Sequence, residues 1–321
     1  MLVLSLMLSS CIYDYDNCPS TLMITVDNDW SQTINADPEG MACLFFADGG
    51  GEPWRFDFPG KDGGRVGMPL GFYSVLSFND DTYNVRFRED EGYRGYTAYT
   101  DGDEHVAFAA VEGMPCVKMP RYMPVEGQRL VKCPDMMWGC AYDRVIIEYG
   151  GIAYSRDSIS RLYYSKEHIL TLEQTQLTAR YSFIIDDVEN LDGVKAMGVT
   201  FSGLAGALNL AAGVKGDYPV TVRSDAHKNG DSVIEGTFIT FGIPETPDTD
   251  NKLTLVTLLA DNRKFSYTFD VTGQVREAED PLDVKVVIHG LKIEQSEQVD
   301  NPGAFEVGVD GWISVIININ S

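Results

Sequence analysis

The amino-acid sequence predicts an all-β protein made of two tandem antiparallel β-sandwich domains. Short segments rich in Val, Ile, Phe, Tyr and Thr follow one another closely, and clusters of Gly, Asn and Asp separate them. Residues 265–271 alternate between apolar and polar side chains, which is the pattern of a strand with one buried face. Long helical segments are not interleaved with the strands, and this favours a sandwich over a doubly wound α/β sheet.

The first domain is expected over residues 21–150. Glycine-rich turns are predicted at residues 49–51 and 62–64. Four prolines between residues 113 and 139 prevent a long regular element, so we place the domain boundary shortly after that stretch. The strands expected in this domain cover residues 21–26, 41–46, 71–78, 83–87, 93–99 and 144–149.

The second domain is expected over residues 151–321. The Glu, Gln and Leu side chains of residues 165–176 predict a short helix near its start. Gly203 and Gly206 have a small-residue spacing found in membrane helices, but Asn209 interrupts the segment, so we expect a bent strand or a glycine turn there. The strands expected in this domain cover residues 181–185, 194–201, 232–241, 253–259, 265–271, 283–288 and 313–319.

The C-terminal residues 312–320 combine high β propensity with an apolar face. Such a strand can complete its own domain, or it can be donated to another molecule, because an open sheet edge has unpaired main-chain groups that an added strand satisfies. Asp310 and Gly311 offer a tight turn into the strand, which favours a place in its own domain.

The N-terminus has the pattern of a bacterial lipoprotein signal. Leu8, Ser9 and Ser10 precede Cys11 and close an apolar run that begins at Met1. Signal peptidase II requires small residues before a cysteine whose thiol carries a diacylglyceryl group. We therefore expect cleavage before the cysteine and attachment of acyl chains such as palmitate. No Lys or Arg precedes the apolar run, although such signals usually begin with basic residues. A start codon assigned too far downstream would explain why they are missing.

This pattern predicts an outer-membrane lipoprotein held by its lipid, on the periplasmic or the cell-surface face. Residues 1–11 are then the signal peptide with the acylated cysteine, and residues 12–20 form a tether. The apolar run is far shorter than the roughly 20 residues of a membrane-spanning helix. The alternative, a buried first strand with an ordinary cysteine, is disfavoured because the polar, tyrosine-rich residues 12–17 follow directly.

The sequence contains 6 cysteines, of which Cys11 is assigned to the lipid. An odd number remains, so these cannot all pair. Cys133 and Cys140 bracket a short loop and can close a disulfide in an oxidising compartment, with Cys116 as a competing partner. The paired Cys or His spacing of zinc sites does not occur in the sequence, and we expect no metal site.

Charge and motif content narrow the classes of function. A formal net charge of -23 repels the phosphates of nucleic acids, so we expect no nucleic-acid partner. The 4 histidines are scattered and belong to neither an H-E-x-x-H nor a G-x-S-x-G motif. Clusters of acidic residues arise by chance in so acidic a chain, so we expect them to be solvated turns and not sites. The sequence therefore predicts no enzyme and no cofactor.

Aromatic side chains suggest glycan binding as an alternative function, because exposed rings can stack on sugars. Aromatic residues at alternate positions are more often buried in a core. The candidates are Tyr13, Tyr15, Trp30, Trp54, Tyr93, Tyr96 and Tyr99.

Several segments together resemble one known family. They are Cys11-Ile-Tyr-Asp-Tyr-Asp, residues 69–81 around Gly71-Phe-Tyr-Ser-Val-Leu, residues 172–181, Phe201-Ser-Gly-Leu-Ala-Gly and Asp310-Gly-Trp. In these segments the chain resembles a set of uncharacterised Bacteroidales lipoproteins, a domain of unknown function, related to the fimbrillin-like superfamily of type V fimbriae. The resemblance covers nearly the whole mature chain.

The resemblance implies two transthyretin-like sandwich domains and a role in fimbrial assembly, anchoring or adhesion through β-strand contacts with other fimbrial subunits. Pilins of that superfamily are cut after an Arg, which opens a groove for a donated strand, whereas anchor subunits keep their lipid and end the polymer. No Arg of this sequence stands in a context that marks such a cleavage site. The alternative is a surface glycan-binding lipoprotein of a polysaccharide-uptake system.

Two serines lie in a short pattern, Asp-Ser-apolar, that resembles the O-glycosylation signal of secreted proteins in this bacterial group. Ser158 lies between Asp157 and Ile159, and Ser232 follows Asp231. Both are expected sites of O-glycosylation.

Overall fold

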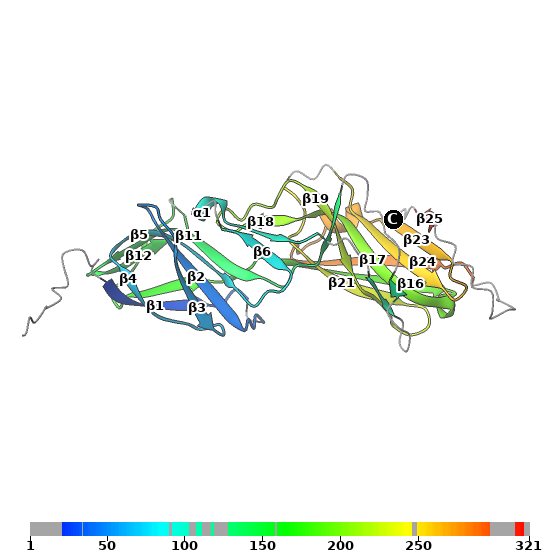
Figure 1. The fold of residues 1–321 in the computed structure, drawn as a ribbon, viewed down its shortest axis with the longest axis horizontal. Coiled ribbons are helices and arrows are strands. Elements are labelled where there is room, and N and C mark those ends of the chain that lie inside the picture. Colours follow the sequence, from blue (N-terminus) through cyan, green and yellow to red (C-terminus); the bar gives the residue numbers. More distant parts are fainter. Residues whose placement is uncertain are drawn as a thin grey trace, which may run out of the picture.

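The computed structural model confirms an all-β protein with two β-sandwiches, which lie end to end along the long axis of the molecule (Figure 1). The N-terminal sandwich is at the left of the figure and the C-terminal sandwich at the right. The structure describes residues 21–33, 35–89, 92–102, 107–110, 117–118, 128–157, 159–245, 249–295 and 312–317.

The first sandwich pairs a large sheet, of strand order β13-β12-β11-β5-β2-β3, with a small sheet, β14-β1-β4, on one of its faces. A third sheet, β18-β7-β6, lies on the other face, and β15 pairs with the start of β11. The elements are β1 (Thr21–Asp29), β2 (Gly40–Ala47), β3 (Trp54–Pro59), β4 (Gly63–Pro69), β5 (Gly71–Asn79), β6 (Val85–Arg88), α1 (Gly92–Gly95), β7 (Thr97–Thr100), β11 (Trp138–Glu148), β12 (Gly151–Ser155), β13 (Tyr163–Ser165), β14 (Ile169–Glu173), β15 (Thr175–Gln176) and β18 (Ala207–Asn209).

The second sandwich packs a sheet of order β10-β19-β17-β22-β23-β25 against a sheet of order β20-β21-β16-β24. β8 pairs with β17 and β9 with β8. The elements are β8 (Ala107–Ala110), β9 (Val117–Lys118), β10 (Arg129–Lys132), β16 (Ala179–Glu189), β17 (Val194–Ala205), β19 (Pro219–Ser224), β20 (Ala226–Lys228), β21 (Ile234–Thr240), β22 (Lys252–Leu259), β23 (Lys264–Asp270), α2 (Thr272–Arg276), β24 (Asp283–Lys292) and β25 (Trp312–Ile317).

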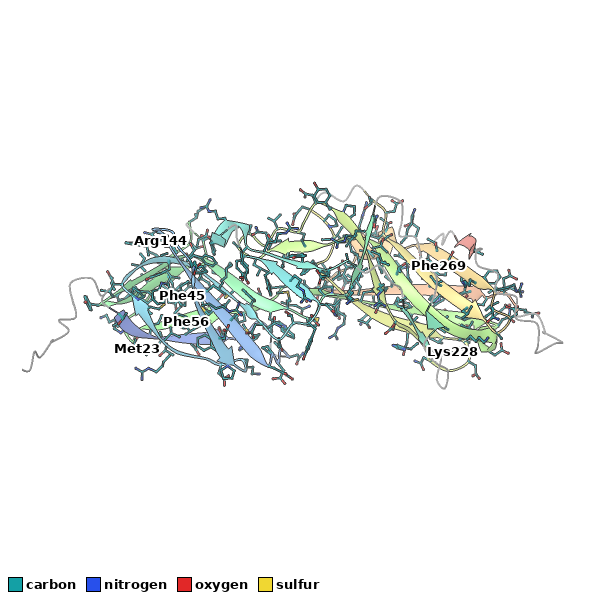
Figure 2. All side chains as sticks on the ribbon, viewed as in Figure 1. Met23, Phe45, Phe56, Arg144, Lys228 and Phe269 are labelled. Carbon is teal, nitrogen blue, oxygen red and sulfur yellow. The ribbon has the colours of Figure 1, made fainter. Side chains whose placement is uncertain are left out.

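The central strands of the large sheet are buried on both faces. Along β2, Met41 and Phe45 face the small sheet, whereas Ala42 and Leu44 face the opposite side. A strand covered on both faces reads as a continuous apolar run, as β2 does, and not as an alternating one. Phe45 and Phe56 meet edge to face between the sheets, with ring centroids 5.9 Å apart (Figure 2).

The opposite face of the large sheet is covered in part by the second half of the chain. β18 follows β17 of the second sandwich directly, yet it pairs with β7 of the first. Leu208, Leu210 and Phe241 are buried in one cluster with Phe78 and Tyr96 of the first sandwich. The first sandwich therefore completes its core only with residues from the second half of the sequence.

The chain also crosses in the other direction. β8 and β10 precede β11 in the sequence but pair with β17 and β19 of the second sandwich. β12 to β15, in contrast, return to the sheets of the first sandwich. The expected boundary between residues 150 and 151 falls inside the β11–β12 hairpin, where Glu148 pairs with Gly151, and so does not separate the two sandwiches. The prediction was wrong because the proline-rich stretch is not a linker at the end of the first sandwich: part of it contributes strands to the second sandwich.

The helix predicted at residues 165–176 is wrong. β14 and β15 occupy this segment, and Leu170 and Leu172 are buried at alternate positions beside β1. Tertiary pairing outweighs the helix propensity of Glu, Gln and Leu here. The β1–β14 pair is parallel, as are β10–β19, β16–β24 and β23–β25, so the sheets are antiparallel with these exceptions among the described strands.

The bend expected near Gly203 is confirmed. The register of β17 against β19 shifts between Phe201 and Leu204, which is a β-bulge. Gly203 has a φ of 78°, and a Cβ at this position would lie 2.7 Å from the Asp250 carbonyl oxygen. Only glycine fits both the conformation and the close approach.

We expect Leu208→Ala to destabilise the whole protein by about 2–5 kcal/mol, because the side chain is 4% exposed and fills the shared core. Val214→Ala is the control, since Val214 is 46% exposed in the loop that follows, and it should change stability by less than about 0.5 kcal/mol. Urea unfolding followed by circular dichroism measures both. Equal midpoints for the two variants would contradict the shared core.

Candidate functional site at the C-terminal strand

Several residues singled out in the sequence lie outside the described residues. These are the lipoprotein signal, Leu8, Ser9, Ser10 and Cys11, the tether of residues 12–20 with its two tyrosines, and Ser158. Lipid attachment and modification at these positions stay predictions. Within the described residues, no helix is both long and apolar enough to span a membrane.

Ser232 lies in the turn between β20 and β21, and its side chain is exposed. Its main-chain carbonyl accepts a hydrogen bond of 2.9 Å from the N–H of Val188, which fixes the turn against β16. The hydroxyl is thus accessible on an ordered turn.

The disulfide expected between Cys133 and Cys140 is not formed. Both thiols are free, and they face different cores: Cys133 packs against the core of the second sandwich and Cys140 is buried in that of the first. The loop between them is short, but it joins strands of two different sandwiches. Burial raises the pKa of Cys133 to about 11 and that of Cys140 to about 12, so both remain uncharged thiols.

Among the described residues, the aromatic side chains proposed for glycan stacking do not share one exposed face. Tyr96 is fully buried, and Trp30 packs on the core of the first sandwich. Tyr93 packs on the shared core and its hydroxyl donates a hydrogen bond of 2.8 Å to Asp143. Trp54 is 44% exposed on the edge strand β3.

Metal binding has no candidate in the part of the chain that the structure describes. No group of three or more His, Cys, Asp and Glu side chains there is placed to hold an ion. His289 instead lies 2.8 Å from Asp186 across the β16–β24 pair. An open sheet edge can bind a strand of another chain, because its main-chain N–H and C=O groups are unpaired.

The edge strand β24 is guarded by a side chain. Gln274, on the short helix α2, donates a hydrogen bond of 3.0 Å to the carbonyl oxygen of Val287 and accepts one of 2.8 Å from its N–H. The side-chain amide thus occupies both main-chain groups that an added strand would use at this position. Nothing in the sequence pattern marked this glutamine, because the contact joins residues 13 positions apart through a helix.

The last strand, β25, occupies the edge beside β23. It runs parallel to β23 from the pair Lys264–Trp312 to the pair Phe269–Ile317. Val315 packs against the core of the second sandwich. In the described structure β25 pairs with no strand other than β23, and parallel pairing is slightly less stable per residue than antiparallel pairing.

The beginning of β23 is held by polar contacts. Arg263 forms a 2.8 Å ion pair with Asp261 and donates a hydrogen bond to the carbonyl oxygen of Gln295. The hydroxyl of Tyr267 accepts a hydrogen bond of 3.2 Å from the N–H of Glu294. These contacts also fix the chain where it leaves β24.

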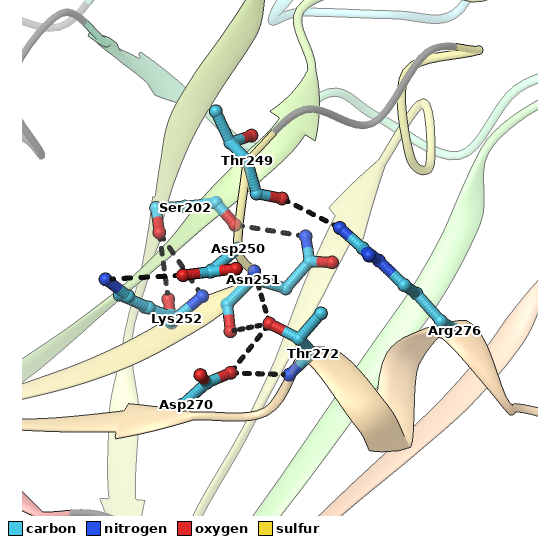
Figure 3. A network of polar contacts seen from close by, with 8 residues as sticks. All are labelled: Ser202, Thr249, Asp250, Asn251, Lys252, Asp270, Thr272 and Arg276. Carbon is cyan, nitrogen blue, oxygen red and sulfur yellow. Dashed lines mark hydrogen bonds and ion pairs between the residues drawn. The ribbon is translucent and has the colours of Figure 1, made fainter.

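The far end of β23 is held by a second network (Figure 3). The Thr272 hydroxyl donates to Asp270 over 2.6 Å and accepts the N–H of Asn251 over 2.9 Å. The Asn251 side chain is buried and donates to the carbonyl oxygen of Ser202. The hydroxyl and N–H of Thr272 hold the pKa of the Asp270 carboxyl below its ordinary value. β23 is therefore fixed at both ends, independently of β25.

The connection to β25 is longer than its end points require. Gln295 contacts Arg263, and Trp312 pairs with the next residue, Lys264, so the two described residues that flank this connection lie at the same end of β23. A chain of this length can span about 50 Å when extended.

The first strand is in the opposite situation. β1 is hydrogen-bonded to β14 on one side and to β4 on the other, and its Ile24 and Val26 are buried in the core. The sequence has no Lys or Arg before Arg55, which pairs with Leu44 in the large sheet. Cleavage after the first basic residue would therefore detach β2, a central strand of the large sheet, together with β1.

We expect Gln274→Ala to promote self-association, because it uncovers the main-chain groups of Val287 at the edge of β24. Sedimentation velocity should give a larger mean mass for this variant than for the original protein at the same concentration. Gln32→Ala is the control, because Gln32 is exposed in the turn after β1 and no hydrogen bond joins its side chain to Val287. Equal masses for the two variants would mean that the Gln274 amide does not protect the edge of β24 from self-association.

Known proteins resemble this chain over most of its length. The family model described as "Domain of unknown function (DUF5119)" matches residues 10–225. The protein named "Putative fimbrium anchoring subunit Fim4B" from Bacteroides ovatus is 22% identical and covers 90% of this chain and 86% of its own length. A crystal structure titled as that of a "putative adhesin" from Bacteroides ovatus has a TM-score of 0.60 at 21% identity, covering 91% of this chain and 99% of the other.

A weaker similarity joins the structure to the fimbrial anchor protein Mfa2 from Porphyromonas gingivalis, with a TM-score of 0.47 at 11% identity over 84% of this chain and 91% of that one. The match to the Bacteroides ovatus structure establishes a common fold. The family match covers more than half of the chain, in agreement with the resemblance seen in the sequence: the protein belongs to the DUF5119 family.

Proposed function

We propose that this protein is a non-enzymatic surface lipoprotein that anchors a fimbrial polymer in the outer membrane and joins the next subunit through its C-terminal strand. The observation that carries the proposal is the placement of β25 at an open sheet edge, at the end of a long connection, beside a β23 that is fixed without it. A donated strand satisfies unpaired main-chain groups along its whole length, and apolar side chains on one face add specificity.

The position of β1 supports a terminal place in the polymer. The resemblance to fimbrillin-like proteins implies that pilins lose their first strand by cleavage after an Arg and so open an acceptor groove. Here β1 is internal, and the first basic residue, Arg55, follows β2, so cleavage there would remove a central strand of the large sheet and not β1 alone. A subunit that keeps its own strand can donate but cannot accept at that place, so it stands at one end of a polymer.

The similar proteins support the same role. The relative with 22% identity is named as a fimbrium anchoring subunit, and it matches this chain over nearly its whole length. The signal at Leu8 to Cys11 supplies the lipid by which such a subunit is retained. Other fimbrial subunits are then its partners, and the outer membrane its location.

We expect a disulfide between β23 and β25 to block assembly. Ser266 and Ser314 are register partners on neighbouring strands, about 4.8 Å apart, and this spacing suits a disulfide in the variant Ser266→Cys with Ser314→Cys. Cells with the oxidised double variant should retain no fimbrial polymer, reduction should restore it, and each single variant should behave like the original protein. An immunoblot of washed cells measures the amount of polymer retained at the surface for each variant.

Two further outcomes separate the parts of the proposal. With Cys11→Ala, polymer should form but appear in the medium, because the lipid is lost. If the oxidised double variant retains as much polymer as the original protein, strand donation is wrong although lipid anchoring can stand. The alternative function is capture of glycans for polysaccharide uptake. In that case neither Cys11→Ala nor the oxidised double variant should change the amount of retained polymer.

We also propose O-glycosylation at Ser232 and Ser158, supported by the exposed turn at Ser232. Intact-mass measurement of the protein from its native host should show added hexoses, and Ser232→Ala should remove one glycan. Ser165→Ala is the control because Ser165 has no preceding Asp. An unmodified mass in the native host would refute the modification.

A further inference from the structure

Large apolar side chains are exposed at the end of the first sandwich where β1 begins. Tyr149 is 70% exposed, Phe72 56%, Met23 53%, Tyr164 50% and Ile169 36%. These five residues are called the collar below. They come from β5, the β11–β12 turn, β13, β1 and the start of β14, so separate segments of the chain bring them to one end.

The strand register shows that part of the collar is continuous. Phe72 pairs with Ile146, Ile146 with Ala153, and Ala153 with Tyr164, so these side chains form one row across the outer face of the large sheet. The Tyr164 hydroxyl donates a hydrogen bond of 2.7 Å to the Gly150 carbonyl oxygen, beside the turn that carries Tyr149. The row is therefore ordered and lies next to the end of the sandwich.

The rest of the collar lies on the other side of the same end. Met23 pairs with Gly67 on the small sheet, and Ile169 pairs with Thr25 in the adjacent row. Figure 2 labels Met23 near the outer end of the first sandwich. An apolar surface on both sides of one end, in a chain with a net charge of -23, marks a contact surface.

The part of the chain that precedes the described residues limits what the collar can meet. β1 starts at Thr21 in the same end, and the chain from Cys11 to Thr21 can span at most about 35 Å. A lipid on Cys11 would thus hold this end within a short distance of the bilayer surface. The strand β25 lies in the other sandwich, toward the opposite end of the molecule (Figure 1).

We propose that the collar rests on the lipid surface and inserts its aromatic side chains among the headgroups. The proposal depends on the lipid anchoring set out under the proposed function. Tyrosine suits this environment because its ring is apolar and its hydroxyl remains hydrated. Lys166 and Glu167 are exposed in the neighbouring turn, so the charges beside the collar are mixed and favour neutral over anionic headgroups.

The contact sets the orientation of the whole molecule. Because the sandwiches share a core, the axis of the protein is fixed relative to the end that touches the lipid. The collar then holds the first sandwich against the membrane and directs β25 away from it, where another subunit can reach it.

A tryptophan reporter tests the contact in the lipidated full-length protein, bound to vesicles of phosphatidylcholine brominated near the headgroup end of its acyl chains. Tyr149→Trp places the reporter in the collar, and Tyr218→Trp is the matched control on the second sandwich, where Tyr218 is 85% exposed. The bromolipid should quench the added fluorescence at position 149 at least about twofold more strongly than at position 218.

A second comparison shows whether the collar itself causes the contact. Phe72→Ser with Tyr164→Ser, added to the Tyr149→Trp protein, should reduce quenching to the level of the control position, whereas Val287→Ser on the second sandwich should not. Equal quenching at positions 149 and 218 in protein that floats with the vesicles overturns the collar contact while anchoring stands. Protein that carries its lipid yet does not float overturns the proposed anchoring, and the contact with it.

Discussion

The first half of the chain does not cover both faces of the large sheet in the first sandwich. The arrangement of the rest of the molecule depends on the segments that complete this cover. β2 and β5 present apolar side chains on both faces, so each face needs a cover. The small sheet supplies one cover, and β18 with Leu208, Leu210 and Phe241 completes the other. The return crossing of β8 and β10 then makes the two sandwiches one body, in which contacts at one end orient the other.

The edges of the two sheets of the second sandwich are closed in different ways. Gln274 closes β24 with two hydrogen bonds, whereas the edge of β23 is filled by a strand on a long connection. Native proteins protect edges because an open one recruits other chains. With β25 donated as proposed, the protein would polymerise at the β23 edge, whereas the Gln274 side chain would prevent aggregation at the β24 edge.

Local patterns predicted many of the strands, because alternation at residues 265–271 and the glycine at position 203 act over a few residues. They missed β3, β4, β10, β12 and β19, and the strand expected at residues 93–99 begins in the helix α1. Predictions that depended on partners distant in the sequence were wrong. Leu170 and Leu172 became a strand because β1 offered a parallel partner, and Cys133 and Cys140 separated because a crossing sends them to different cores. The sequence predicted the apolar C-terminal strand of the candidate site. It could not predict the parallel pairing of β25 or the Gln274 contact on β24, because both depend on how the sheets assemble.

The shared core also governs the order in which the protein can fold. Phe78 and Tyr96 contact their final neighbours only when Phe241 is present, so the first sandwich cannot complete its core before the second half of the chain has been synthesised. Contacts so distant along the chain form slowly and leave apolar surface exposed in the meantime. The yield of such a chain should therefore depend on chaperones that bind unfolded segments until the second half of the sequence is available.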